Sequence, residues 1–141
     1  MQQDDQGTVD PKGVDVRRLL ATVPADTPVT MLNLLRFRAE AAYPPDAGHA
    51  PCSGREAYAR YSTVAIEKVR AVGGEPVYVA DALARFIGPA GEDWDQVILV
   101  RYPSLQAFLA MLALPDYQAA AVHRSAALAD SRLTVTRTPQ T

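Results

Sequence analysis

The sequence predicts an α+β fold in which a four-stranded antiparallel sheet carries helices on one face. Three observations predict it: the segments follow the order strand, helix, strand, strand, helix, strand; two strands are apolar on both sides; and residues 55–72 have a clear helical period. This order is the split βαβ or ferredoxin-like plan, with an extra helix in front of it. With 141 residues, of which 48% are hydrophobic, the chain can bury one core as a single domain.

The N-terminal part is predicted to lead into the fold rather than belong to its sheet. Residues 1–12 are polar and rich in Gln, Asp and Gly, which predicts a disordered or extended N-terminus, with 13–141 as the domain. Residues 14–23 predict the leading helix, which ends before Pro24. Residues 29–37 predict a first strand that is apolar on both faces, so that neither face is suited to water.

A long loop and the main helix follow this strand. Residues 38–53 contain three prolines and no hydrophobic period, which is typical of a long loop that covers a site. Residues 55–72 form the clearest helix, because their apolar positions recur at spacings of three and four, and Gly73-Gly74 ends it.

The second half of the chain repeats the alternation of strands and helices. A second strand is predicted over 76–82, with an extension to Ile87 left open, and a third over 94–102. Ser104 caps a helix over 105–114. Pro115 and Asp116 restart a helix over 117–129, and the final strand covers 132–137, as the alternation there predicts.

Composition excludes several classes of partner. The net charge of -2 comes from 14 basic and 16 acidic residues scattered along the chain, so no basic stripe is available for nucleic acid. Cys52 is the single cysteine, which excludes an intrachain disulfide. No signal-like leader and no apolar run of about 18–20 residues is present, so we expect a cytoplasmic protein that does not enter a membrane.

The strand pattern also predicts self-association. Helices cover one face of such a sheet, whereas the two central strands, 29–37 and 94–102, are apolar on both. The simplest cover for the second apolar face is the same face of another copy. We therefore expect a homodimer.

Four motifs resemble the bacterial family known as domain of unknown function 1330. The similarity runs from about Pro28 to about Val135 and rests on Met31-Leu-Asn-Leu-Leu-Arg36, Arg101-Tyr-Pro-Ser104, Pro115-Asp-Tyr-Gln-Ala-Ala120 and Ala127-Leu-Ala-Asp-Ser-Arg132. The resemblance implies a dimeric α+β barrel. Its relatives include cofactor-independent monooxygenases, muconolactone isomerases and polyketide cyclases, besides haem enzymes and plain ligand binders. The leading helix and the 38–53 loop depart from the short form of the family.

Asn33 is the first candidate for a functional role. It is an amide in an otherwise apolar strand, where leaving it unpaired would cost on the order of 1–3 kcal/mol. It is either a structural hydrogen-bonding residue or a donor to a ligand oxygen, the role that the resemblance implies for some relatives. Arg36 leaves the same strand on the opposite face, as a solvated strand end or an anion clamp.

The predicted helix 117–129 carries the most informative pair. Arg124 falls on its apolar side, so the guanidinium must meet a carboxylate, a carbonyl or a ligand. His123 flanks that face and is either a general acid/base or a boundary residue. His49 approaches a pocket if the 38–53 loop is a lid, and is otherwise an exposed loop residue.

Aromatic residues suit both a core and a cavity wall. Tyr58 and Tyr61 share one face of the main helix, and Trp94 flanks the third strand. Such side chains are ordinarily core, but their polar tips can also orient a flat, oxygenated substrate. Arg101 ends the third strand and either joins this wall or forms a salt bridge at its rim.

No metal or cofactor is predicted. The chain has two histidines and one cysteine without zinc-binding spacing. It has no dinucleotide fingerprint, P-loop or nucleophile-elbow motif. Haem ligation through His123 or His49 is the option that the resemblance leaves open.

The leading hypothesis is a cofactor-independent isomerase, cyclase or lyase that transfers a proton on a small oxygenated or aromatic molecule. In it Asn33 and Tyr61 stabilise an enolate-like oxygen and His123 moves the proton. The substrate-binding candidates are Arg124, Tyr58, Arg36, Trp94, Arg101 and His49. A cofactor-free monooxygenase and a non-catalytic binding or accessory protein are the alternatives.

Overall fold

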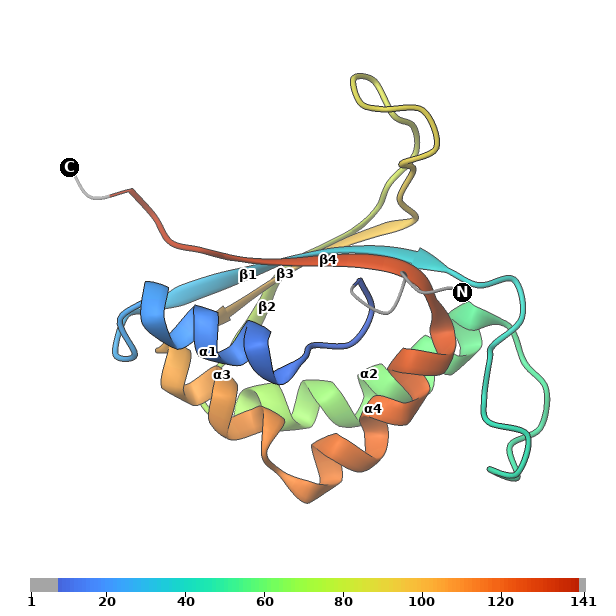
Figure 1. Cartoon of the computed structure of the whole chain (residues 1–141), viewed down its shortest axis with the longest axis horizontal. Helices are drawn as coiled ribbons and strands as arrows, with labels where there is room; N and C mark the ends of the chain where they lie inside the picture. Colours follow the sequence, from blue (N-terminus) through green and yellow to red (C-terminus); the bar gives the residue numbers. More distant parts are fainter. Residues whose placement is uncertain (1–7, 140–141) are drawn as a thin grey trace.

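The computed structural model describes residues 8–139 and confirms the split βαβ plan. Its antiparallel sheet has the order β2-β3-β1-β4, formed by β1 (Val29–Phe37), β2 (Glu75–Asp81), β3 (Gln96–Tyr102) and β4 (Leu128–Thr136). Figure 1 shows one face of this sheet covered by α1 (Gly13–Thr22), α2 (Gly54–Ala71), α3 (Leu105–Leu112) and α4 (Pro115–Ala127). A site enclosed by the fold therefore lies on this helix side.

The register of β1 decides which side chains face the helices. Met31 and Leu35 are buried, with 1% and 0% of their surface exposed. Asn33 lies between them and points to the same side, because side chains alternate along a strand. Asn33 pairs with Ile98 of β3, so both side chains face the space under the helices.

The outer face of the sheet is the apolar surface that the sequence predicts. Leu32 and Leu34 of β1 lie beside Leu99 and Val97 of β3, and each is only half-buried in the single chain. Tyr78 of β2 is 55% exposed. No helix within residues 8–139 covers this face (Figure 1).

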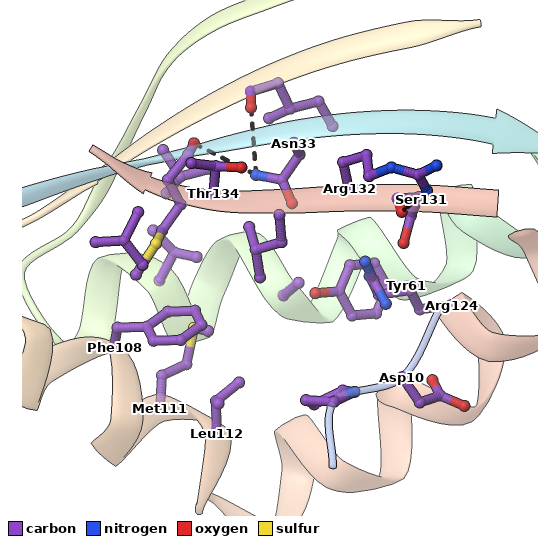
Figure 2. A pocket seen from close by; sticks show the side chains of 18 of the residues that line it. Asp10, Asn33, Tyr61, Phe108, Met111, Leu112, Arg124, Ser131, Arg132 and Thr134 are labelled. Atoms are coloured by element: carbon purple, nitrogen blue, oxygen red, sulfur yellow. Dashed lines mark hydrogen bonds between the residues drawn. The ribbon is translucent and has the colours of Figure 1, made fainter. Parts of the chain in front are cut away.

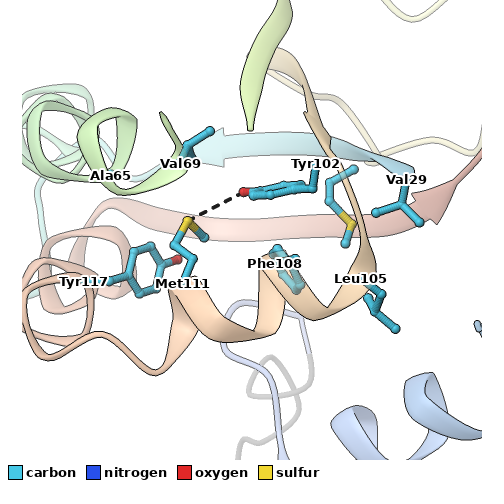
Figure 3. Packing of buried hydrophobic residues seen from close by; sticks show 9 residues of the cluster. Val29, Ala65, Val69, Tyr102, Leu105, Phe108, Met111 and Tyr117 are labelled. Atoms are coloured by element: carbon cyan, nitrogen blue, oxygen red, sulfur yellow. Dashed lines mark hydrogen bonds between the residues drawn. The ribbon is translucent and has the colours of Figure 1, made fainter. Parts of the chain in front are cut away.

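Two apolar clusters hold the helices to the sheet. The larger one, shown in Figure 3, contains Val29, Met31, Ala65, Val69, Tyr102, Leu105, Phe108, Met111 and Tyr117. The smaller one contains Leu35, Ala57, Tyr58, Ala127 and Leu128. Fully burying a large apolar side chain stabilises a fold by about 1.5–3 kcal/mol. Because α2 and α4 contribute to both clusters, they are fixed to the sheet along their length.

Local signals set the helix ends. Ser53 Oγ accepts from the Glu56 N–H at 3.0 Å and Glu56 Oε1 accepts from the Ser53 N–H at 2.8 Å, which is a capping box for α2. Ser104 caps α3 as predicted, since its Oγ accepts from the Ala107 N–H at 3.0 Å. Gly73 follows α2 with a φ of 86°, a conformation that favours glycine.

Strand boundaries differ most from the prediction at two places, while the others agree within two residues. The extension of the second strand to Ile87 is wrong, because pairing with β3 ends at Asp81 opposite Gln96. Residues 82–95 instead form an arm, which Figure 1 shows projecting from the sheet away from the helices. The last strand begins at Leu128 rather than at residue 132, because Leu128 already pairs with Phe37.

The N-terminal region is partly described. Residues 1–7 of the predicted disordered or extended segment lie outside the described residues. Residues 8–11, here called the N-terminal strap, contact β4 and α4 and lead into α1. The leading helix α1 has no buried residue.

Candidate functional site

A cavity of about 1070 Å³ lies between the sheet and the helices. Its wall is mostly apolar and includes Met31, Ile98, Phe108, Met111 and Leu112. Figure 2 shows Phe108, Met111 and Leu112 on the helix side of the cavity, with Tyr61, Arg124 and Ser131 toward its other end. A cavity of this size and polarity is suited to a small organic molecule.

Three tyrosines stand together in this wall. The Tyr61 and Tyr117 hydroxyl oxygens lie 2.8 Å apart, and the Tyr58 and Tyr61 ring centroids lie 5.2 Å apart. Burial, opposed by the nearby Arg124 guanidinium, raises the pKa of Tyr58 to about 12. Burial and the neighbouring Tyr117 raise the pKa of Tyr61 well above its usual value. Tyr58 and Tyr61 therefore keep their protons at neutral pH and can donate hydrogen bonds.

Arg124 lines the cavity from α4, as its helical position predicts. Its Nη1 donates to the Val9 carbonyl at 2.7 Å. Among the described residues, no carboxylate forms an ion pair with it. The positive charge is thus available to an oxygen that develops negative charge inside the cavity.

Asn33 has the structural role, but its orientation corrects the expected donor role. Its Nδ2 donates to the Ile98 carbonyl at 3.2 Å and, at 3.4 Å, to the Met31 carbonyl. Both amide hydrogens are therefore used by the sheet, and Figure 2 shows Oδ1 on the helix side, facing the cavity. Asn33 offers a ligand an acceptor, not a donor.

The N-terminal strap closes the polar end of the cavity. The Thr8 carbonyl accepts from Ser131 Oγ, next to the contact between Val9 and Arg124. The Asp10 carboxylate accepts from Ser125 Oγ at 2.6 Å. The strap is therefore tied to both β4 and α4.

His123 does not line this cavity. Successive residues of a helix are rotated by about 100°, so an inward Arg124 places His123 toward another surface. His123 Nδ1 lies 2.6 Å from the Tyr43 hydroxyl, and the Arg60 guanidinium donates to that hydroxyl at 3.1 Å. Burial, followed by His49 and Arg60, lowers the pKa of His123.

The 38–53 loop brings His49 to this second cluster instead of to the cavity. The His49 ring stacks on Tyr43 with centroids 4.3 Å apart and meets the His123 ring at 5.1 Å. None of these three residues is part of the cavity lining. The loop therefore covers α4 and does not act as a lid in this conformation.

Three other candidates lie away from the cavity. Arg36 donates to the Gly91 carbonyl at 3.1 Å, and the Arg132 guanidinium lies 5.1 Å from the Trp94 ring centroid. Both contacts fix the base of the arm. Arg101 is exposed at the end of β3 and lies outside the cavity lining.

Neither a metal site nor a membrane span is evident in the part of the chain that the structure describes. Residues 8–139 hold no group of three or more His, Cys, Asp or Glu placed to bind a metal ion. No helix among them is both long and apolar enough to cross a bilayer.

Sequence reasoning missed Tyr117 and Ser131 as site residues. Tyr117 lies seven residues before Arg124, two helical turns away, so the signal for a shared face was present. Ser131 was placed just before the last strand, and its inward direction follows only from the observed pairing with Leu35. The strap carbonyls carry no sequence signal, because every residue has one.

Solved structures resemble this chain to different degrees. A protein of unknown function from Rhodopseudomonas palustris has a TM-score of 0.85 and 36% identity, over 95% of this chain and 98% of that chain. A dimeric protein of unknown function with a ferredoxin-like fold from Bacteroides fragilis has a TM-score of 0.46 and 15% identity, covering 79% and 96%. SnoaB, a cofactor-independent oxygenase from Streptomyces nogalater, has a TM-score of 0.47 and 18% identity, covering 81% and 95%. The last two resemblances are distant.

Family membership rests on a separate comparison. No curated protein matches the chain significantly. The model of the family described as domain of unknown function (DUF1330) matches residues 48–138, well over half of the chain. The strong match to the Rhodopseudomonas palustris protein extends the shared fold to nearly the whole length. The chain belongs to the DUF1330 family.

Proposed function

We propose that this protein is a cofactor-independent enzyme that acts on a small, largely apolar, oxygenated molecule held in the cavity. The observation that carries the proposal is the group of Tyr58, Tyr61, Tyr117 and Arg124 in a mostly apolar wall. Donors and a fixed positive charge in a dry site stabilise an anionic oxygen far better than water does. An isomerase, cyclase or lyase that passes through an enolate or phenolate would use such a group.

The acid/base residues available limit the substrate. Asp10 and Asp15 are the only carboxylates among the described residues of the lining, which contains no histidine. Hydrogen bonding with the Lys12 backbone and Arg18 lowers the pKa of Asp15, which makes it a weak base. The site is thus better at stabilising an anion than at forming one. A substrate with an acidic proton, such as a phenol or a 1,3-dicarbonyl, fits these residues.

The role of His123 as proton carrier stays a prediction of the sequence. Its neighbours are Tyr43, His49 and Arg60, and a path from them to the cavity would require a movement of α4 or of the 38–53 loop. We therefore base the proposal on the tyrosines and Arg124. A cofactor-free monooxygenase would use the same stabilised anion.

A non-catalytic ligand-binding protein is the second candidate. The specific observation in its favour is the lack of an imidazole or of a deep carboxylate in the described lining. Binding alone needs only the apolar wall and the polar end. Catalysis also requires that a proton be transferred or that a bond form or break, so a measurement of turnover distinguishes the two candidates.

The experiment uses 4-nitrophenol, whose anion is coloured, and 1-phenyl-1,3-butanedione, whose α-protons exchange in D₂O. We expect bound 4-nitrophenol to have a lowered apparent pKa, and the protein to accelerate deuterium exchange in the diketone. Tyr61→Phe and Tyr117→Phe should reduce both effects, whereas Tyr78→Phe, the same change on the outer face, should not. Binding without faster exchange supports the binding protein, and a raised 4-nitrophenol pKa contradicts both candidates.

We also propose that two copies pair through the outer face of the sheet. Leu32, Leu34, Val97 and Leu99 leave an apolar surface there, and the arm carries Phe86 with 96% of its surface exposed on the same side. Apolar surface of this kind is stabilised when a second copy removes it from water.

A further inference from the structure

A guanidinium without a charged partner faces the cavity. Arg124 is partly buried, and its partners in the structure, the Val9 carbonyl and the Tyr58 hydroxyl, are neutral. Arginine carries five N–H donors in a planar fork, and a carboxylate accepts two of them at once. A carboxylate is therefore a stronger partner for Arg124 than the carbonyl that now occupies it.

The strap places two oxygens where such a carboxylate would lie. The adjacent carbonyls of Thr8 and Val9 accept from Ser131 Oγ and Arg124 Nη1. One donor comes from β4 and the other from α4, and Figure 2 shows both side chains at the same end of the cavity. Arg124 Nη1 and Ser131 Oγ thus both donate toward this end of the cavity, where the oxygens of a ligand carboxylate would accept.

We propose that Arg124 and Ser131 form a carboxylate subsite, and that the strap occupies this subsite until a ligand displaces it. The inference rests on the proposed function and narrows the substrate class to amphipathic organic acids. The acid group lies at Arg124 and Ser131. The apolar body extends along Met31, Ile98 and Phe108.

Charges around the subsite favour this exchange. Asp10 belongs to the strap, so its negative charge leaves when the strap is displaced. Asp130 is fixed by Arg132 at 2.7 Å and by Arg36 at 3.5 Å, which offsets its charge. Arg124 and Arg55 then remain as the guanidinium groups without an ion pair among the described residues of the lining, and Arg55 lies over the Phe37 ring. Arg124, at the polar end, can therefore attract an anion.

The strap can leave without opening the core. The helix that follows it, α1, has no buried residue, and Leu20 on that helix is 50% exposed. The core clusters contain no strap or α1 residue among their buried members. Val9 of the strap packs against the smaller cluster as a partly buried side chain, so displacement exchanges this contact and a few polar contacts, while the buried members of both clusters keep one another as neighbours.

Two fluorescent probes of the same shape test the subsite on the full chain: 1-pyrenebutyrate, which is anionic, and 1-pyrenebutanol, which is neutral. We expect the butyrate to bind about tenfold or more tightly than the alcohol, as charge-assisted hydrogen bonds predict. Arg124→Met should remove this preference, so that the variant binds the butyrate no more tightly than the alcohol. Arg124→Lys keeps the positive charge but not the planar fork of donors, so it should retain part of the preference for the butyrate. This variant also tests the subsite if the Met variant does not fold.

Ser125→Ala tests the competition, because Ser125 holds the strap through Asp10 but does not belong to the subsite. We expect it to tighten butyrate binding several-fold and to change alcohol binding by less than about twofold. Thr63→Ala, which removes an exposed hydroxyl bonded within α2, is the matched control. If Ser125→Ala tightens the binding of both probes equally, or does not tighten the binding of the butyrate, the strap does not compete with a carboxylate for the subsite.

The outcomes separate this inference from the proposed function. Equal affinity of the wild-type protein for both probes overturns the carboxylate subsite, while the cavity remains a binding site for neutral oxygenated molecules. Absence of binding for both probes contradicts the cavity as a ligand site and with it the proposed function.

Discussion

The hydroxyl oxygens of Tyr61 and Tyr117 lie 2.8 Å apart, in contact across α2 and α4. One hydroxyl donates to the other, so the pair keeps one proton for a ligand or for a neighbouring acceptor. This contact joins two helices that are far apart in the sequence. Because burial raises the pKa of Tyr58 and Tyr61, ionisation of these tyrosines also affects the stability of the fold.

Alkaline pH should destabilise the protein through its buried tyrosines. An unfolded tyrosine ionises near pH 10, whereas burial raises the pKa of Tyr58 to about 12. Between these values the unfolded state binds fewer protons than the native state, so the free energy of unfolding falls by about 1.4 kcal/mol per pH unit for such a group. Urea denaturation from pH 9 to 12 measures the slope. Tyr58→Phe should flatten it, and Tyr78→Phe should leave it unchanged; equal slopes in both variants would contradict the assignment.

Acidic pH should act on the second cluster through His123. Burial, His49 and Arg60 lower the pKa of this imidazole, so the native state binds its proton later than the unfolded state as the pH falls. Stability contributed by neutral His123 is therefore present above the unfolded pKa and lost as the pH drops through the folded pKa. NMR titration should place the His123 midpoint below 6.5, and His49→Ala should raise it. A midpoint unmoved by that change would show that the two rings do not interact.

The orientation of Asn33 predicts that two substitutions, to Asp and to Leu, reduce the stability of the protein to different extents. Asn33→Asp removes both hydrogens that bond the Met31 and Ile98 carbonyls and places a charge beside them, so we expect a loss of about 1–3 kcal/mol in the free energy of unfolding at neutral pH. This loss should shrink as acid protonates the carboxylate. Asn33→Leu should be tolerated better but bind a hydroxylated ligand more weakly than wild type. Chemical denaturation at pH 5 and 7 checks the first part. If Asp is tolerated as well as Leu, Nδ2 does not make these bonds.

Gly54 is predicted to be required where the 38–53 loop meets α4. A Cβ at this position would lie 2.7 Å from the Ala127 carbonyl and would also clash with the Arg38 backbone. Gly54→Ala should therefore destabilise the protein by about 1–3 kcal/mol, as forced overpacking does. Gly13→Ala in α1, where the nearest atom lies 3.5 Å away, should be neutral or slightly stabilising. Thermal unfolding of both variants measures the difference, and similar melting temperatures would refute the close approach.

A charge on the outer face should prevent pairing of two copies. Leu99→Lys places an ammonium in the apolar surface, which is costly to bury without a partner. Light scattering coupled to gel filtration should give about one chain mass, 15.2 kDa, for this variant and twice that for wild type. Leu20→Lys, on the exposed side of α1, is the control and should stay dimeric. A wild-type protein that runs at one chain mass at micromolar concentration would rule out the proposed dimer.

Sequence alone was sufficient for the elements whose signals are local. The first strand was predicted at its observed bounds, Val29–Phe37, because a short apolar run between polar segments is typical of a buried strand. Ser104 was identified as a cap because capping involves residues three apart. The inward direction of Arg124 followed from helical period, which a sequence displays directly.

Tertiary structure alone decided what Arg124, Asn33 and His123 contact. Arg124 donates to the Val9 carbonyl, which lies 115 residues away in the sequence. Asn33 donates to the Ile98 carbonyl, 65 residues away, and His123 contacts Tyr43, 80 residues away. Local periodicity fixes the direction of a side chain relative to its own helix or strand. Its partner depends on strand register and on where a loop packs, and these are set by contacts between distant segments. The sequence therefore determined the fold and the polarity of the cavity wall, whereas the packing of strap, loop and sheet determined which polar groups face a ligand.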